Sequence, residues 1–61
     1  MDLHDELIRA SRQLGDWKRL LKQAESLGFT EYETIWMKIR DELDRHERRL
    51  LQLLELFRGE S

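Results

Sequence analysis

The chain has 61 residues, with eleven Lys and Arg against thirteen Asp and Glu, and it contains neither cysteine nor proline. The lack of cysteine excludes disulfides and thiolate metal sites, and the formal net charge of −2 gives no bulk attraction to nucleic acid or anionic membranes. A chain this short buries only about 60% of the surface that its unfolded form exposes. We therefore expect oligomerisation or a partner to complete its stability.

The sequence contains neither a membrane-spanning nor a secretory pattern. It lacks the apolar run of about 18 residues that a transmembrane helix requires. Its acidic beginning, residues 1–6, lacks the basic start and apolar core of a signal peptide. We expect a cytoplasmic protein.

A first helix is predicted over residues 2–27. Asp2 is a good N-cap, and Asp5 and Glu6 lie in the first turn, where the helix dipole favours anions. Apolar residues then alternate at spacings of four and three, as in a heptad repeat. This first stripe comprises Leu3, Leu7, Ala10, Leu14, Trp17, Leu21 and Ala24. Gly28 follows the helix as its left-handed C′ residue.

The pair Gly15-Asp16 is an alternative end for this helix, because Asp16 could cap a second helix and give three in all. Glycine inside a helix costs about 1 kcal/mol relative to alanine. The first stripe keeps its phase across the pair, so the sequence favours one continuous helix.

A second helix is predicted over residues 31–58. Thr30 and Glu33 form a Thr-x-x-Glu capping box at its start, and Phe29 can cover Ala24 in the turn before it. Gly59 marks its end. The second stripe comprises Tyr32, Trp36, Ile39, Leu43, His46, Leu50, Leu53 and Phe57.

These elements predict an all-α fold: a single domain, residues 1–61, that forms an antiparallel two-helix hairpin with a tight turn at residues 28–30. Folding the chain there pairs the two stripes from turn to termini. The expected layers are Ala24 with Tyr32, Leu21 with Trp36, Trp17 with Ile39, Leu14 with Leu43, Ala10 with His46, Leu7 with Leu50, and Leu3 with Leu53.

More apolar residues are present than one pair of helices can bury. A helix with a wide apolar face is covered on more than one side. We therefore expect a homodimer in which two hairpins form a four-helix bundle, or a protein partner. The predicted oligomer or partner interface comprises Ile8, Leu20, Leu27, Ile35, Leu51, Leu54, Leu56 and Phe57.

His46 is the one stripe residue of a type that titrates near neutrality. It could be a buried switch or ligand, but a seam histidine that is hydrogen-bonded to Ser11 or to a neighbouring acid is the favoured interpretation. Helical di-metal sites use Glu-x-x-His on inward faces, and position 43 is leucine here. We therefore predict no metal site, no cofactor and no catalytic residues.

Five arginines fall in neighbouring layers under this pairing and form a possible anion or nucleic-acid patch. The alternative is a solvated face neutralised by acid-before-base pairs four residues apart. Those expected pairs are Asp5–Arg9, Asp41–Arg45 and Asp44–Arg48. The five arginines are Arg9, Arg12, Arg45, Arg48 and Arg49, with Arg12 expected near Arg45 and Arg9 near Arg48.

The segment Glu42-Leu43-Asp44 resembles the end of the Ser-Gln-Glu-Leu-Asp motif of the sporulation aspartyl-phosphate phosphatases of bacilli, which are also small helical hairpins. Arg40 and Asp41 replace the Ser-Gln pair. This resemblance implies phosphatase-type signalling through Asp44. The residues themselves favour a non-catalytic interaction or regulatory module that acts as a homodimer, with an RNA-binding regulator as a further alternative.

Overall fold

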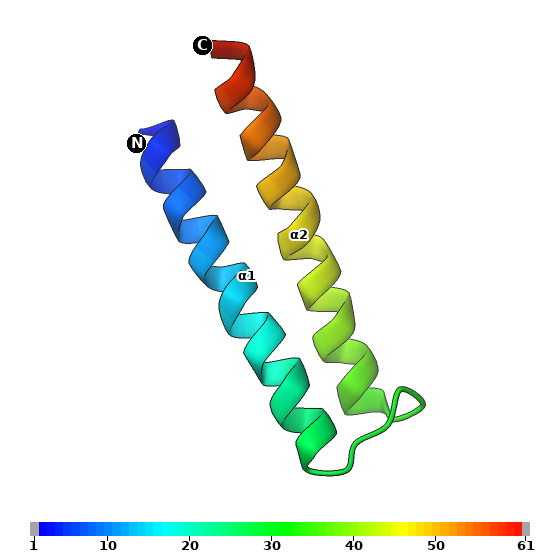
Figure 1. Ribbon diagram of the computed structural model, residues 1–61. Helices are drawn as coiled ribbons and strands as arrows, with labels where there is room; N and C mark the ends of the chain where they lie inside the picture. The colour runs from blue at the N-terminus through cyan, green and yellow to red at the C-terminus, as the bar shows by residue number, and fades with distance from the viewer. Residues whose placement is uncertain (1, 61) are drawn as a thin grey trace.

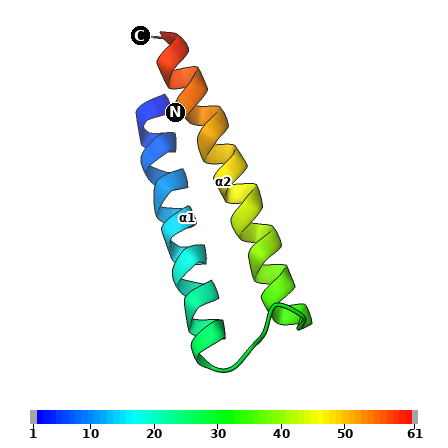
Figure 2. The same cartoon turned by 45° about the vertical axis from the view of Figure 1, so that its right-hand side comes forward.

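The computed structural model describes residues 2–60, of which Glu60 is described by its backbone only. Two helices, α1 (Leu3–Ser26) and α2 (Thr34–Glu60), form an antiparallel hairpin of 44 × 15 × 15 Å. Figures 1 and 2 show that both chain ends lie at the end opposite the connection, where α2 projects beyond α1. We call this the open end. The predicted helical hairpin is confirmed.

Both ends of α1 are built as the sequence predicts. The carboxylate of Asp2 accepts a hydrogen bond from the backbone N–H of His4 at 3.3 Å. At the other end, the N–H of Phe29 bonds the carbonyl of Ala24, and the N–H of Gly28 bonds the carbonyl of Glu25, each at 3.0 Å. Together with the φ of +96° at Gly28, these bonds define a Schellman motif. The motif satisfies carbonyls that the helix would otherwise leave without partners.

The helix α1 runs unbroken through Gly15-Asp16, as the phase of the first stripe predicts. An added Cβ on Gly15 would meet no atom within 4 Å. No close approach therefore requires glycine here, and its effect is the backbone entropy that it adds to the unfolded chain.

The start of α2 differs from the prediction. Residues 30–33 form a turn that the N–H of Glu33 closes by bonding the carbonyl of Thr30, and the first bond into the helix runs from Met37 to Glu33. The connection therefore spans residues 27–33, and the helix starts at Thr34 rather than at residue 31 through a Thr30 capping box. The N–H of Glu33, which the Thr30 side chain would accept in a capping box, instead bonds the Thr30 carbonyl, so residues 31–33 belong to the connection. At its far end, α2 continues through Gly59 to Glu60 instead of ending at residue 58. Ser61 lies outside the described residues.

The core is a single seam between the helices. Its buried side chains are all stripe residues: Ala10, Leu14, Leu21, Ala24, Ile39, Leu43 and Leu53. Trp17, Phe29, Trp36 and Leu50 are partly buried against the cluster formed by Leu14, Leu21, Ala24, Ile39 and Leu43. No side chain in the described part of the chain is less than 2% exposed. The seam is therefore thin.

The longer connection changes the register of the two stripes. His46 stacks on Trp17, with ring centroids 5.8 Å apart, whereas the expected layer pairs His46 with Ala10. The ring centroids of His4 and Phe57 lie 6.3 Å apart. Tyr32 is 83% exposed in the connection and does not cover Ala24 as expected. The helices are thus shifted by more than one turn relative to the expected layers. A heptad stripe packs almost equally well after such a shift, so the connection determines the register.

Neither helix is long and apolar enough to span a membrane, judged over the residues that the structure describes.

Candidate interaction surface

An open apolar hollow lies between the two helices near the open end. Its volume is about 580 Å³. The lining residues are His4, Leu7, Ile8, Ser11, Arg12, Leu50, Leu54 and Phe57. These residues come from the first three turns of α1 and from the second half of α2, so the hollow is confined to one half of the hairpin.

Four large apolar side chains at this hollow remain in contact with water. Ile8, Leu54 and Phe57 line the hollow and are 42%, 46% and 43% exposed. Leu51, one turn from Leu54, is 56% exposed. We call Ile8, Leu51, Leu54 and Phe57 the open-end patch. The two helices alone leave this patch without a covering layer.

The heptad repeat explains why these side chains gather on one side. Ile8, Leu51 and Leu54 each directly follow a stripe residue in the sequence. In an antiparallel pair, the positions after the stripes of both helices flank the seam on the same side. We call this the patch side. Positions that directly precede a stripe residue flank the seam on the opposite side.

The remaining four residues of the predicted interface are exposed but lie elsewhere. Leu20, Ile35 and Leu56 each precede a stripe residue, so they lie on the opposite side, and Leu27 is 78% exposed in the connection. The predicted interface is therefore two separate surfaces. The sequence already contains the distinction, because the residues of each surface differ in whether they follow or precede a stripe.

The five arginines do not form one face. Arg9 and Arg49 line a second hollow of about 270 Å³ on the opposite side, together with Glu6 and Gln13. Arg12 lines the first hollow. The expected approach of Arg12 to Arg45 therefore does not occur on a shared surface, because Arg45 directly precedes a stripe residue and lies on the opposite side.

The ion pairs also differ from the expected set. Arg45 pairs with Glu42 at 3.0 Å instead of with Asp41, because the residue three positions away is in reach. Asp44 pairs with Arg40 at 3.4 Å instead of with Arg48. Asp5–Arg9 is not among the ion pairs within 4.0 Å of the described residues. In the motif-like segment, Asp44 is thus paired with Arg40, at a position where the phosphatases have serine.

His46 is held at the seam by an aromatic contact rather than by a hydroxyl. Its ring is nearly parallel to Trp17, with an interplanar angle of 22°. Its Nε2 lies 3.9 Å from a carboxylate oxygen of Glu42, which is beyond hydrogen-bond distance. His46 therefore lies at the seam as expected, but among the described residues neither Ser11 nor a neighbouring acid forms the expected hydrogen bond with it, and the sequence did not indicate the stacking contact.

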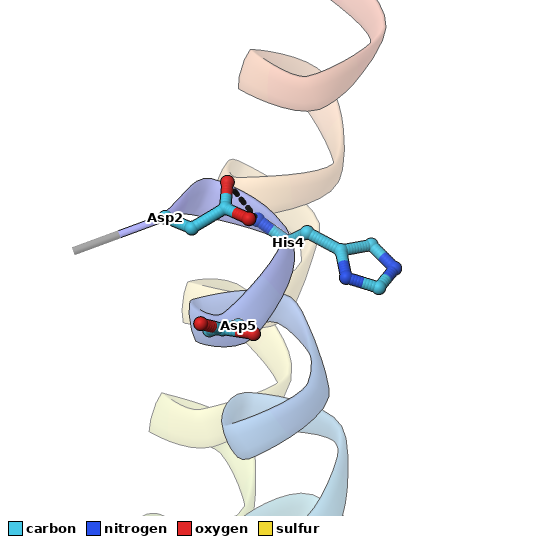
Figure 3. A group of neighbouring side chains, drawn as sticks. All are labelled: Asp2, His4 and Asp5. Atoms are coloured by element: carbon cyan, nitrogen blue, oxygen red, sulfur yellow. Dashed lines mark hydrogen bonds between the residues drawn. The ribbon is translucent and has the colours of Figure 1, made fainter.

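Sequence reasoning did not identify one group of possible ligands at the start of α1. Figure 3 shows Asp2, His4 and Asp5 around the first turn, and one ligand atom of each lies within 4.8 Å of the others. The Asp-x-His-Asp spacing was the available signal. All three residues are exposed, and the Asp2 carboxylate already caps the helix (Figure 3). A helix N-cap accounts for this group without a metal.

No family model matches the chain, and neither a curated protein nor a solved structure is similar to it.

Proposed function

We propose that this chain is a small cytoplasmic, non-catalytic interaction module whose active form is a homodimer of hairpins. The open-end patch forms the contact between the two copies. The surface on the opposite side, around Leu20 and Ile35, then remains available to a further protein partner. The observation that carries the proposal is the exposed apolar hollow lined by Ile8, Leu54 and Phe57.

The size of the patch fits a weak but real contact. The exposed fractions of its four side chains correspond to roughly 300–400 Å², which equals the largest patch on a typical monomer. Two copies would remove roughly 700 Å² of apolar surface from water, worth on the order of 17 kcal/mol at 25 cal/mol per Å². Association costs roughly 4–15 kcal/mol. The difference, roughly 2–13 kcal/mol, is favourable to association but does not fix the dissociation constant, because buried area alone does not set affinity.

Association would add buried apolar surface to a hairpin whose own core is thin. Its seven buried side chains include two alanines, and stripe residues such as Leu7 and Leu50 remain partly exposed. Domains of this size rarely obtain more than about 3–5 kcal/mol from a single core. A second hairpin over the patch would add a second apolar layer to the half where, among the residues with described side chains, α2 buries only Leu53.

The test is the mass of the protein in solution, measured by sedimentation across concentrations from one to several hundred micromolar. The wild-type chain should dimerise within this range. Leu54→Glu should remain monomeric, because it places a charge in the contact.

Leu20→Glu is the matched control. Leu20 is also a helical leucine and is 41% exposed against 46% for Leu54, but it lies on the opposite side. It should dimerise like the wild type. A monomeric wild-type chain, or equal effects of the two substitutions, would refute the proposed contact.

A further inference from the structure

The patch side of the hairpin is divided into an apolar half and a charged half. The open-end patch occupies the half near the chain ends. Toward the connection, the equivalent positions after stripe residues are charged and exposed or half-buried, with Gly15 and Met37 as the exceptions. The charged residues are Lys18, Lys22, Glu25, Arg40, Asp44 and Glu47.

These charged groups remain hydrated in the hairpin. Arg40 and Asp44 form an ion pair at 3.4 Å, and their side chains are 49% and 38% exposed. Covering this half with the same half of a second copy would remove the charges from water, and a new ion pair repays such a loss only when its geometry is excellent. The half near the open end carries fewer charges, with Arg12 at the edge of the hollow and Arg58 after Phe57, so covering it costs less.

Two symmetric arrangements would bring the open-end patches together. With a two-fold axis parallel to the helices, the hairpins overlap along their full length, connection beside connection, and the charged halves are covered. With a two-fold axis perpendicular to the helices, the second copy is reversed end for end. Only the open halves then overlap, and both charged halves stay in water.

We infer that the open-end patch binds a second copy of this chain in the reversed arrangement, so that the two hairpins overlap only by their open halves. This inference rests on the proposed function and specifies its partner and geometry. The contact is self-complementary, as a two-fold interface requires, because each patch residue lies near its own counterpart or a neighbour in the other copy. The dimer is an elongated rod with a connection at each end.

The distance between the two connections distinguishes the arrangements. Ile8 lies at the centre of the patch, and the helical rise from Ile8 to the connection at Leu27 is roughly 30 Å at 1.5 Å per residue. The reversed dimer therefore places the two connections roughly 60 Å apart. Full-length overlap would place them within roughly 20 Å, about two interaxial distances.

The experiment is pulsed electron–electron dipolar spectroscopy on the full chain with one nitroxide label. Since the sequence has no cysteine, Thr30→Cys in the connection gives a unique and exposed attachment site. At a concentration where sedimentation shows a dimer, the two Thr30→Cys labels should lie roughly 60 Å apart. A control label at Glu55→Cys, exposed near the patch, should give less than roughly 35 Å in either arrangement.

Each outcome bears on a different statement. A short Thr30 distance with a short Glu55 distance would overturn the reversed arrangement and leave the proposed dimer intact. A long Glu55 distance in a dimeric sample would overturn the patch as the contact, and the inference with it. A monomeric mass would overturn the proposed function. Leu54→Glu in the labelled chain should abolish the dipolar signal, and persistence of the signal would also count against the patch.

Discussion

Replacing two glycines by alanine should change the stability of the hairpin in opposite directions. Gly15 lies within α1 in ordinary helical geometry, and a Cβ there meets no atom within 4 Å. Alanine is favoured over glycine by about 0.8–1.0 kcal/mol inside a helix. We therefore expect Gly15→Ala to raise the free energy of unfolding by about 1 kcal/mol.

Gly28 has the same open surroundings but a different backbone. Nothing lies within 4 Å of an added Cβ, yet its φ is +96°, a conformation that side-chain-bearing residues rarely adopt. A left-handed conformation costs an L-residue roughly 1–2 kcal/mol. Gly28→Ala should therefore lower the free energy of unfolding by that amount, so the two alanine variants differ by about 2–3 kcal/mol.

Thermal unfolding followed by far-UV circular dichroism measures both effects. For a domain of 60–100 residues, 1 kcal/mol shifts the Tm by about 4–8 °C. All samples should have the same protein concentration, because dimerisation makes the Tm concentration-dependent. Gly59→Ala, in the last turn of α2 where the helix frays, is the control and should change little. A lower Tm for Gly15→Ala would refute a continuous α1, and an unchanged Tm for Gly28→Ala would refute the Schellman motif.

Three further substitutions test the seam and the first cap. Leu43→Ala removes a side chain that is 3% exposed, so it should lower the free energy of unfolding by about 2–5 kcal/mol. Circular dichroism should then show a largely unfolded chain, and a cooperative transition near the wild-type Tm would contradict the seam. In a Trp36→Phe background, Trp17 is the single tryptophan. His46→Ala should there shift the fluorescence emission of Trp17 to longer wavelength and lower the free energy of unfolding by about 1 kcal/mol, whereas an unchanged spectrum would argue against the stack. Asp2→Ala should lower the free energy of unfolding in urea by about 0.5 kcal/mol, since the 3.3 Å hydrogen bond that Asp2 accepts from His4 caps a terminal turn. A loss equal to that of Leu43→Ala would contradict the assignment of Asp2 as an N-cap.

The helices and the first cap could be predicted from the sequence because they depend on local signals. The spacing of the first stripe, the acids after Asp2 and the glycine at position 28 act within one or two turns of the chain. All seven buried residues belong to the predicted stripes for the same reason. The exposure of Ile8 and Leu54 likewise follows from their positions beside the stripes.

The register could not be predicted because it depends on the connection. Thr30 and Glu33 match a capping box, but in the structure they close a turn one residue before α2 begins. The two stripes accept either register, since a heptad repeat is similar to itself after a shift of one or two turns. The stacking of His46 on Trp17 depends on the register, so the sequence did not predict it.

The register also decides which surface residues become neighbours, and therefore what the hairpin can bind. The observed connection brings Ile8 and Leu54 to one hollow, and it brings Arg9 and Arg49 to another on the opposite side. A shift of the helices moves residues along the seam but leaves each on its own side, because the side is set by position relative to a stripe. The division between an apolar and a charged half of the patch side is therefore insensitive to the register. The proposed reversed overlap of two copies therefore rests on a feature of the sequence that does not depend on any individual layer of the core.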